Sequence, residues 1–173
     1  MKIVITDVNV FFDLFELKVI PQFFDLDWEI HTTDFVLNEI VYEEQIKEFE
    51  EFARLNKLRV IKVTSEEVAL IKQFELKRPN KSFPDKTALW HAKQMGCILL
   101  TGDGPLRTEA EFQKIEVHGS IWVLLQLLEN ELINAFQTIK LLNDLKKINS
   151  RLPRNEIDLI ISRLKQKTEA NGM

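Results

Sequence analysis

The sequence contains little cysteine, glycine or proline, and each shortage narrows the class of protein. Its 173 residues include one cysteine, Cys97, which excludes an internal disulfide and a zinc site built from cysteines. Five glycines and five prolines argue against a loop-rich all-β fold. With 45% hydrophobic and 29% charged residues, the composition predicts a soluble globular protein of one-domain size.

Long apolar runs are also missing. The longest unbroken run, residues 121–125, is far shorter than the ~20 residues that a membrane span requires. The first residues resemble a strand that reaches Asp7, and no apolar stretch of signal-peptide length precedes that aspartate. We therefore expect a cytoplasmic protein that does not enter a membrane.

Charge is distributed unevenly along the chain. Residues 1–133 hold 15 Lys and Arg against 23 Asp and Glu, whereas residues 134–173 hold 8 against 4. A net charge of −4 disfavours nucleic-acid binding, which relies on Lys and Arg at phosphates. A carboxylate cluster that holds metal would itself make the first part acidic, so the charge excludes neither possibility.

Strand-like and helical segments alternate through most of the sequence. Strands are predicted over residues 2–6, 29–32, 58–63, 97–101 and 115–118. Helices are predicted over 8–14, 35–42, 46–55, from 65, and over 84–95, 119–128, 135–145 and 153–164. This order predicts a three-layer α/β/α sandwich with a central parallel sheet of four or five strands, the first at its centre. We assign residues 1–133 to this domain and residues 134–173 to a C-terminal helical hairpin packed on it.

Four acidic residues lie where such a sheet would bring them together. Asp7 and Asp103 each follow a predicted strand, Asp85 lies in the first turn of a helix, and Glu39 lies in the helix after the second strand. Ligands bind beyond the carboxyl ends of parallel strands. Carboxylates gathered there raise one another's pKa unless a cation is present, and Mg²⁺ or Mn²⁺ is the cation that prefers oxygen ligands. Such ions catalyse phosphodiester hydrolysis.

The segments around these four residues resemble the PIN-domain nucleases. Residues 3–10, IVITDVNV, resemble the opening strand of that family, which ends in aspartate. Residues 82–88, SFPDKTA, resemble its second aspartate helix, and residues 99–103, LLTGD, resemble its later strand end. Glu39 in VLNEI fits the helical glutamate between them, and the resemblance covers roughly residues 2–120.

The resemblance implies a metal-dependent endoribonuclease that acts on single-stranded RNA. Many bacterial members are VapC-type toxins paired with an antitoxin, so we expect either such a toxin or another PIN nuclease. The implied catalytic and metal-binding residues are Asp7, Glu39, Asp85 and Asp103. We also expect a homodimer.

Neighbouring polar residues are candidates for supporting roles. Asn9 either hydrogen-bonds beside Asp7 and helps to hold metal or water, or has a local helical role. Thr101 is placed to support the carboxylates, and Ser82 either caps its helix or contacts phosphate. Basic residues close to Asp85 and Asp103 in sequence are either simply solvated or position RNA phosphates: Lys77, Arg78, Lys81, Lys86 and Arg107.

Two other functions compete with the nuclease hypothesis. Asp7, Asp85 and Asp103 taken singly are equally typical of helix caps and turns. The chain is alternatively a non-catalytic PIN-like binding or scaffold module, in which the apolar helix over residues 119–128 and the terminal hairpin serve oligomerisation or bind a partner peptide. The presence of all four acidic residues disfavours this alternative. A strand ending in Asp-Val-Asn also resembles HAD-like phosphatases. That family has a second aspartate where this sequence has Asn9, which disfavours the phosphatase alternative.

Overall fold

Five parallel strands form the sheet of the computed structural model, which describes residues 2–77 and 81–171. The strands are β1 (Lys2–Thr6), β2 (Trp28–Thr33), β3 (Leu58–Ile61), β4 (Ile98–Leu100) and β5 (Val117–His118). Their order is β3-β2-β1-β4-β5, and every neighbouring pair is parallel. The first strand therefore lies at the centre, as predicted.

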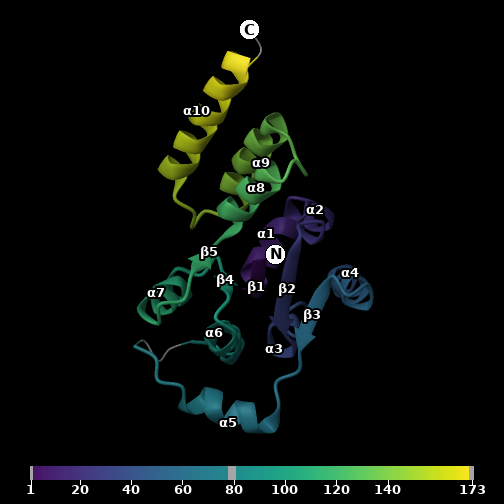
Figure 1. Cartoon of the computed structure of the whole chain (residues 1–173), viewed down its shortest axis with the longest axis vertical. Helices are drawn as coiled ribbons and strands as arrows, with labels where there is room; N and C mark the ends of the chain where they lie inside the picture. The colour runs from purple at the N-terminus through teal and green to yellow at the C-terminus, as the bar shows by residue number, and fades with distance from the viewer. Residues whose placement is uncertain (1, 78–80, 172–173) are drawn as a thin grey trace. The chain divides into compact units, whose positions relative to one another are not determined.

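Helices connect the strands and continue after the last one. They are α1 (Val8–Glu16), α2 (Ile20–Phe24), α3 (Asp34–Leu37), α4 (Glu43–Arg54), α5 (Ser65–Gln73), α6 (Phe83–Met95), α7 (Gly104–Phe112), α8 (Ser120–Glu129), α9 (Ala135–Ile148) and α10 (Arg154–Asn171). Parallel neighbours need crossover connections, which these helices supply. The result is the predicted α/β/α sandwich (Figure 1). None of the helices in the described part of the chain is long and apolar enough to cross a membrane.

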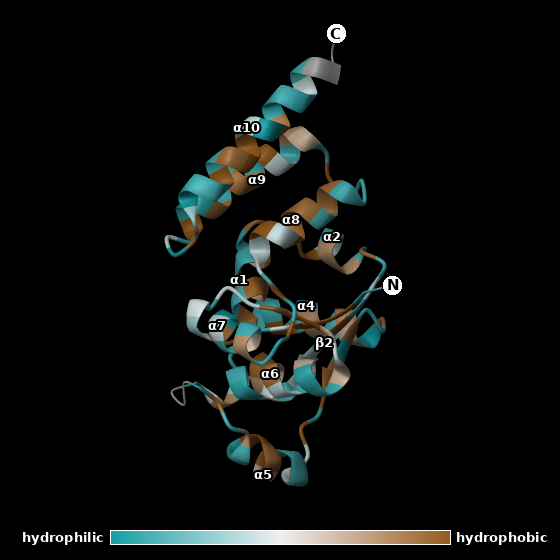
Figure 2. Ribbon diagram, turned by 60° about the vertical axis from the view of Figure 1, so that its left-hand side comes forward, coloured by the Kyte–Doolittle hydropathy of each residue, from teal (hydrophilic) through white to brown (hydrophobic). Residues whose placement is uncertain are grey.

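Apolar side chains fill the middle of the sheet. Val4 and Ile5 of β1 and Leu99 and Leu100 of β4 have no exposed surface. Strands covered on both faces read as continuous apolar runs rather than alternating ones, which is why residues 3–5 and 98–100 are recognisable as strands in the sequence. In Figure 2 the strands are largely brown, and the helices carry both brown and teal residues.

Contacts divide the chain into two compact units. The first consists of Met1–Phe12 and Asp27–Gly119, and the second of Asp13–Leu26 and Ser120–Met173. The first unit contains the sheet and all the candidate site residues that the structure describes. This division differs from the predicted domain boundary at 133/134, which stays a prediction.

The second unit contains the C-terminal helical hairpin. Leu142 and Leu145 of α9 and Ile157 of α10 are fully buried, and the two helices pack against each other. Lys146 of α9 also pairs with Asp158 of α10, with 2.5 Å between Nζ and Oδ1. The amphipathic pattern of these helices therefore produces an apolar contact inside the unit.

One predicted helix is much shorter in the structure than expected. The helix expected over residues 35–42 ends at Leu37, and Glu39 lies in the turn that follows. Val36 and Ile40 are both buried, at the four-residue spacing that suggests a longer helix. The chain buries Ile40 through a turn instead.

Two helices are absent from the sequence-based prediction. α2 is only five residues long, too short to show a helical period. α7 begins directly after Asp103, whose carboxylate Oδ1 accepts a hydrogen bond from the Leu106 backbone N–H at 2.6 Å. Gly104 and Pro105 are typical of a turn, although aspartate followed by proline also marks the start of a helix.

Candidate active site

Asp7 and Asp103 lie at the same edge of the sheet because β1 and β4 are parallel neighbours. Asp7 directly follows β1, and its backbone N–H donates to the Leu100 carbonyl at the end of β4, at 2.9 Å. Asp103 comes three residues after Leu100. The sheet register thus brings together two aspartates that are 96 positions apart in the sequence.

The Asp7 carboxylate is fully buried, and in the described structure only one of its two oxygens accepts hydrogen bonds. Its Oδ2 accepts hydrogen bonds from Asn9 Nδ2 at 2.9 Å and from Thr101 Oγ1 at 2.8 Å. Its Oδ1 is buried and has no hydrogen-bond partner in the described part of the chain. Both supporting residues, Asn9 and Thr101, therefore contact the carboxylate that they were expected to support.

The surroundings of Asp7 disfavour its charge. Burial raises the pKa of the Asp7 carboxyl above its ordinary value, and the negative charge of Asp85 raises it further. The hydrogen bonds from Asn9 and Thr101 lower the pKa but do not reverse the shift. A buried carboxylate with one unpaired oxygen is costly unless it gains a proton or a cation.

Thr101 connects Asp7 to Asp103. While its hydroxyl donates to Asp7, the same Oγ1 accepts the Asp103 backbone N–H at 3.0 Å. Asp103 caps α7 through its Oδ1, which also lies 3.5 Å from Lys81 Nζ. The Lys81 side chain is only 4% exposed, so a buried cation stands beside this carboxylate.

Asp85 is held at the start of α6 by a reciprocal cap with Ser82. The Asp85 backbone N–H donates to Ser82 Oγ at 3.1 Å, and Asp85 Oδ2 accepts the Ser82 backbone N–H at 3.3 Å. Ser82 therefore has the helix-capping role, one of its two predicted roles. Burial raises the pKa of the Asp85 carboxyl, and the negative charge of Asp103 raises it further. The hydrogen bonds with Ser82 lower this pKa but do not reverse the shift.

Glu39 reaches the same region from the turn after α3. Partial burial raises the pKa of its carboxyl, and the negative charges of Asp7 and Asp85 add to the effect. Glu39 thus interacts electrostatically with two of the other acidic residues, although it lies in a turn rather than in the predicted helix. Asp85 in turn interacts with Asp7 and Asp103, so the four form one linked group.

The arrangement of the four carboxylates bears on metal binding. Across residues 2–77 and 81–171, no three acidic, histidine or cysteine side chains are positioned to hold one ion between them. The donor set still suits a hard divalent cation, because it consists of carboxylate oxygens and includes the unpartnered Asp7 Oδ1. Asp85 and Asp103 are each committed to a helix cap, so joint coordination requires rotation of side chains.

The predicted RNA-binding residues have different surroundings. Arg107 donates to the Val117 carbonyl at 3.1 Å and to the Thr101 carbonyl at 3.5 Å, so its guanidinium joins the first residue of β5 to the residue that follows β4. Lys77 is exposed, with its Nζ 4.7 Å from the centre of the Phe112 ring. Lys86 is half-buried, Lys81 contacts Asp103, and Arg78 lies outside the described residues.

Two buried threonines near the site are not evident from the sequence. Thr33 Oγ1 accepts the Val36 backbone N–H at 3.2 Å and lies 2.8 Å from Thr87 Oγ1 of α6. This pair joins the start of the helix that precedes Glu39 to the helix that carries Asp85. The sequence gives one indication of the position of Thr33: threonine directly before Asp34 is typical of a helix start.

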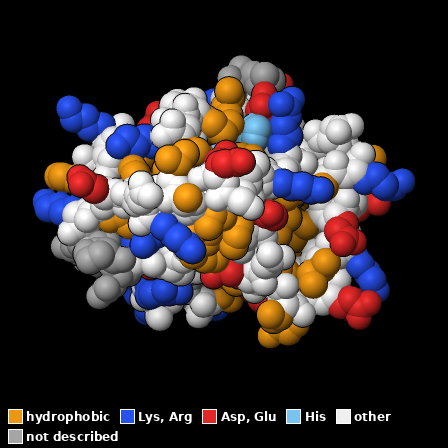
Figure 3. All heavy atoms as spheres, turned by 90° about the horizontal axis from the view of Figure 1, so that it is seen from below, with side chains coloured by type: hydrophobic (Ala, Val, Ile, Leu, Met, Phe, Trp, Pro, Cys, Tyr) orange, Lys and Arg blue, Asp and Glu red, His pale blue; other side chains and the backbone are white. Residues whose placement is uncertain are grey.

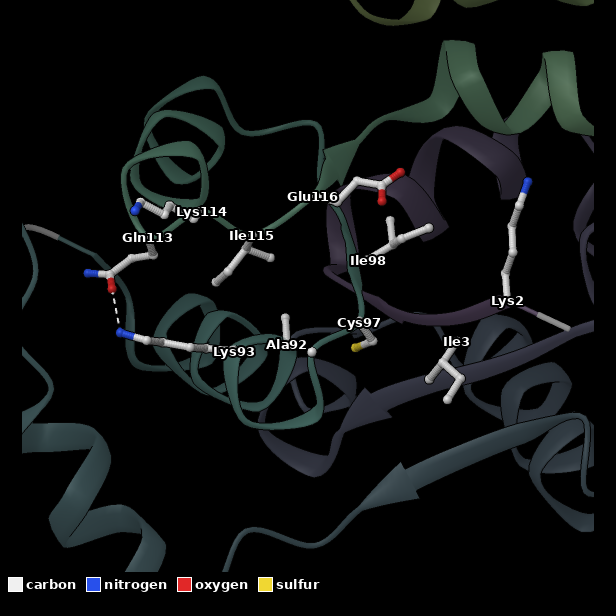
Figure 4. A pocket seen from close by; sticks show the side chains of 11 residues that line it. Lys2, Ile3, Ala92, Lys93, Cys97, Ile98, Gln113, Lys114, Ile115 and Glu116 are labelled. Carbon is white, nitrogen blue, oxygen red and sulfur yellow. Dashed lines mark hydrogen bonds between the residues drawn. The ribbon is translucent and has the colours of Figure 1, made fainter.

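A separate pocket lies at the opposite end of the strands. It measures about 460 Å³, and its lining includes Lys2, Cys97 and Glu116, which stand at or just before the starts of β1, β4 and β5 (Figure 4). Lys93 donates to Gln113 Oε1 across it at 2.6 Å. Burial raises the pKa of the Cys97 thiol to about 11, so the thiol stays protonated and unreactive. The candidate active site is therefore not this pocket.

Comparisons with known proteins agree with the fold. A family model described as DUF3368: PIN domain matches residues 3–166. A solved structure, a PilT N-terminus domain protein from the hyperthermophilic archaeon Sulfolobus solfataricus, is similar with a TM-score of 0.51 and 11% identity. The similarity covers 73% of this chain and 94% of that one. The search of curated proteins found no match. Because the family model spans nearly the whole sequence, the chain belongs to the PIN-domain family.

Proposed function

We propose that this protein is a metal-dependent endoribonuclease that hydrolyses phosphodiester bonds in single-stranded RNA. PIN domains are generally nucleases, which gives the reaction class. The observation that carries the proposal is Asp7, a fully buried carboxylate whose Oδ1 has no partner in the described structure. Its charge is further disfavoured by Asp85, an arrangement that a cation would relieve.

The ligands would come from Asp7, Glu39, Asp85 and Asp103, with Mg²⁺ or Mn²⁺ as the cofactor. A bound divalent cation lowers the pKa of water and stabilises negative charge on phosphate oxygens. Asn9 and Thr101 fix the orientation of Asp7 by bonding its Oδ2, which leaves Oδ1 free for a ligand. Lys81 lies against Asp103 and offsets part of the negative charge that RNA would meet there.

One observation favours the alternative of a non-catalytic scaffold. Asp85 and Asp103 already serve as helix caps, and helix capping alone is sufficient reason for both residues. The phosphatase alternative has less support, because the Asn9 amide donates to Asp7 and cannot act as the general acid that an aspartate provides.

The test is a cleavage assay with the pure protein on end-labelled unstructured and hairpin RNAs. We expect endonucleolytic products from the unstructured RNA with Mg²⁺ or Mn²⁺ and none with EDTA. Metal-independent products, or none under any condition, would refute the proposal. The single cysteine is compatible with action in the cytoplasm, whereas the homodimer and the antitoxin partner stay predictions.

A further inference from the structure

A pocket of about 350 Å³ lies immediately beside the Glu39 turn. Asn38 and Ile40, the two residues that flank Glu39, both line it. Its apolar lining continues on α4 with Ile46 and Phe49. Phe49 is only 2% exposed and its ring lies 4.4 Å from that of Phe11, so this part of the lining is fixed in the core.

The polar side chains of the pocket are mostly hydrogen-bond acceptors. Asp34 and Glu50 contribute carboxylates, and Asn38 contributes an amide that both donates and accepts. The Asp34 Oδ1 already accepts backbone N–H groups from Phe35 at 3.0 Å and Val63 at 3.3 Å, so this carboxylate is held in place. Two acidic groups repel phosphate and favour a ligand with N–H donors.

Apolar lining with a polar, acceptor-rich border suits a nucleobase. A base has two apolar faces, and its edge carries hydrogen-bonding groups. Adenine and cytosine present exocyclic amino groups at that edge, whereas uracil has none. A base in a duplex cannot enter such a pocket without unstacking, whereas an unpaired base can.

We propose that this pocket binds an unpaired nucleobase next to the scissile phosphate and prefers adenine or cytosine to uracil. This inference rests on the proposed function, because Glu39 links the pocket to the carboxylates. Asn38 supplies the edge contact, and Ile46 and Phe49 supply apolar contact with the base. The pocket thereby positions the strand and restricts where it is cut.

The experiment measures binding rather than cleavage. Short fluorescent oligonucleotides of A, C or U are titrated against Asp7→Asn protein in EDTA, so that no RNA is consumed. Two pocket variants are added to this background: Asn38→Ala removes the amide, and Ile46→Trp fills the space. Leu55→Trp is the matched control, because Leu55 follows α4, is 52% exposed and is not part of the lining.

We expect A and C oligonucleotides to bind more tightly than U. Asn38→Ala should weaken A and C binding by roughly two- to tenfold, the usual effect of losing one hydrogen bond. Ile46→Trp should weaken binding of all three, and Leu55→Trp should change nothing. Equal affinity for the three bases, or pocket variants that behave like the control, would overturn the inference.

A parallel Mg²⁺-dependent cleavage assay of the wild type separates this inference from the proposed function. Cleavage together with base-independent binding overturns the pocket alone. Base-selective binding that the pocket variants abolish, without cleavage, supports the pocket and overturns the nuclease.

Discussion

At the scale of single residues, the stability of the metal-free protein should depend on the charge of Asp7. A raised folded-state pKa means that this carboxyl contributes most below its unfolded value of 3.8, and that the contribution is lost as pH rises through the folded pKa. We predict that Asp7→Asn in EDTA matches the wild type in acid and is more stable near neutral pH, where the wild type buries a charged oxygen without a partner in the described structure, at a cost of roughly 1–3 kcal/mol. Urea unfolding across a pH series measures this, and a pH-independent difference would argue against it.

Divalent cations should reverse the order of stability, so that the wild type becomes more stable than Asp7→Asn. Mg²⁺ that binds only the folded wild type raises its free energy of unfolding, by about 2.7 kcal/mol at a concentration of 100 Kd. Asp7→Asn lacks the ligand charge and should gain little. Thermal melts with increasing Mg²⁺ report the effect. A similar rise in both proteins would place the cation elsewhere.

Thr101 is the residue whose loss should affect two carboxylates together. Thr101→Val keeps the shape but removes the bonds to Asp7 Oδ2 and to the Asp103 backbone N–H. We predict a loss of roughly 1.5–3 kcal/mol in the free energy of unfolding, together with weaker Mg²⁺ binding. The control is Thr108→Val, whose hydroxyl is exposed and donates to the Gly104 carbonyl within its own helix. Equal stability losses in the two variants would show that the hydrogen bonds of Thr101 to Asp7 and Asp103 add no more stability than an exposed hydroxyl does.

At the scale of elements, removing the cap of α6 tests whether the free energy of unfolding and the metal dependence of cleavage change independently. Ser82→Ala removes the cap and should cost about 1 kcal/mol of unfolding free energy. Thr64→Ala removes the equivalent cap from α5, with a similar cost. Only Ser82→Ala frees Asp85 to rotate, so we predict that it alone changes the Mg²⁺ concentration for half-maximal cleavage. Identical metal dependence in both variants would mean that the Asp85 cap does not limit metal binding.

The elements also show what the sequence alone can reveal. Asp7, Asp85 and Asp103 can be placed from the sequence because apolar runs and a proline mark the strand and helix ends beside them. The same reasoning assigns Glu39 to a helix, because the spacing of Val36 and Ile40 is the same for a helix and for this turn. The Thr33–Thr87 contact joins residues 54 positions apart, and no local pattern specifies such a pair.

At the scale of the whole molecule, charge should govern RNA affinity through salt. Acidic, basic and apolar side chains are interspersed on the face seen in Figure 3. Residues 134–173 carry the basic excess, and the family model extends to residue 166, so these helices belong to the family's unit. We predict that changing Lys165 and Lys167 of α10 to Gln weakens RNA binding. Removing one interaction with a phosphate reduces the steepness of log affinity against log salt by about 0.7.

The matched variant for this test replaces Lys62 and Lys72, two exposed lysines of the first unit, with Gln. It changes the net charge equally and should leave the salt slope nearer to that of the wild type. Fluorescence anisotropy with unstructured RNA at several salt concentrations gives the slopes. The same slope for both variants would show that net charge alone matters.

Asp7 is the residue whose carboxylate we propose to hold the metal ion that RNA cleavage requires. The most direct measurement compares wild type and Asp7→Asn, purified side by side, on one end-labelled unstructured RNA with Mg²⁺ and with EDTA. Circular dichroism confirms that both proteins are folded. We predict Mg²⁺-dependent cleavage by the wild type and none by the folded variant. Undiminished cleavage by Asp7→Asn would contradict it.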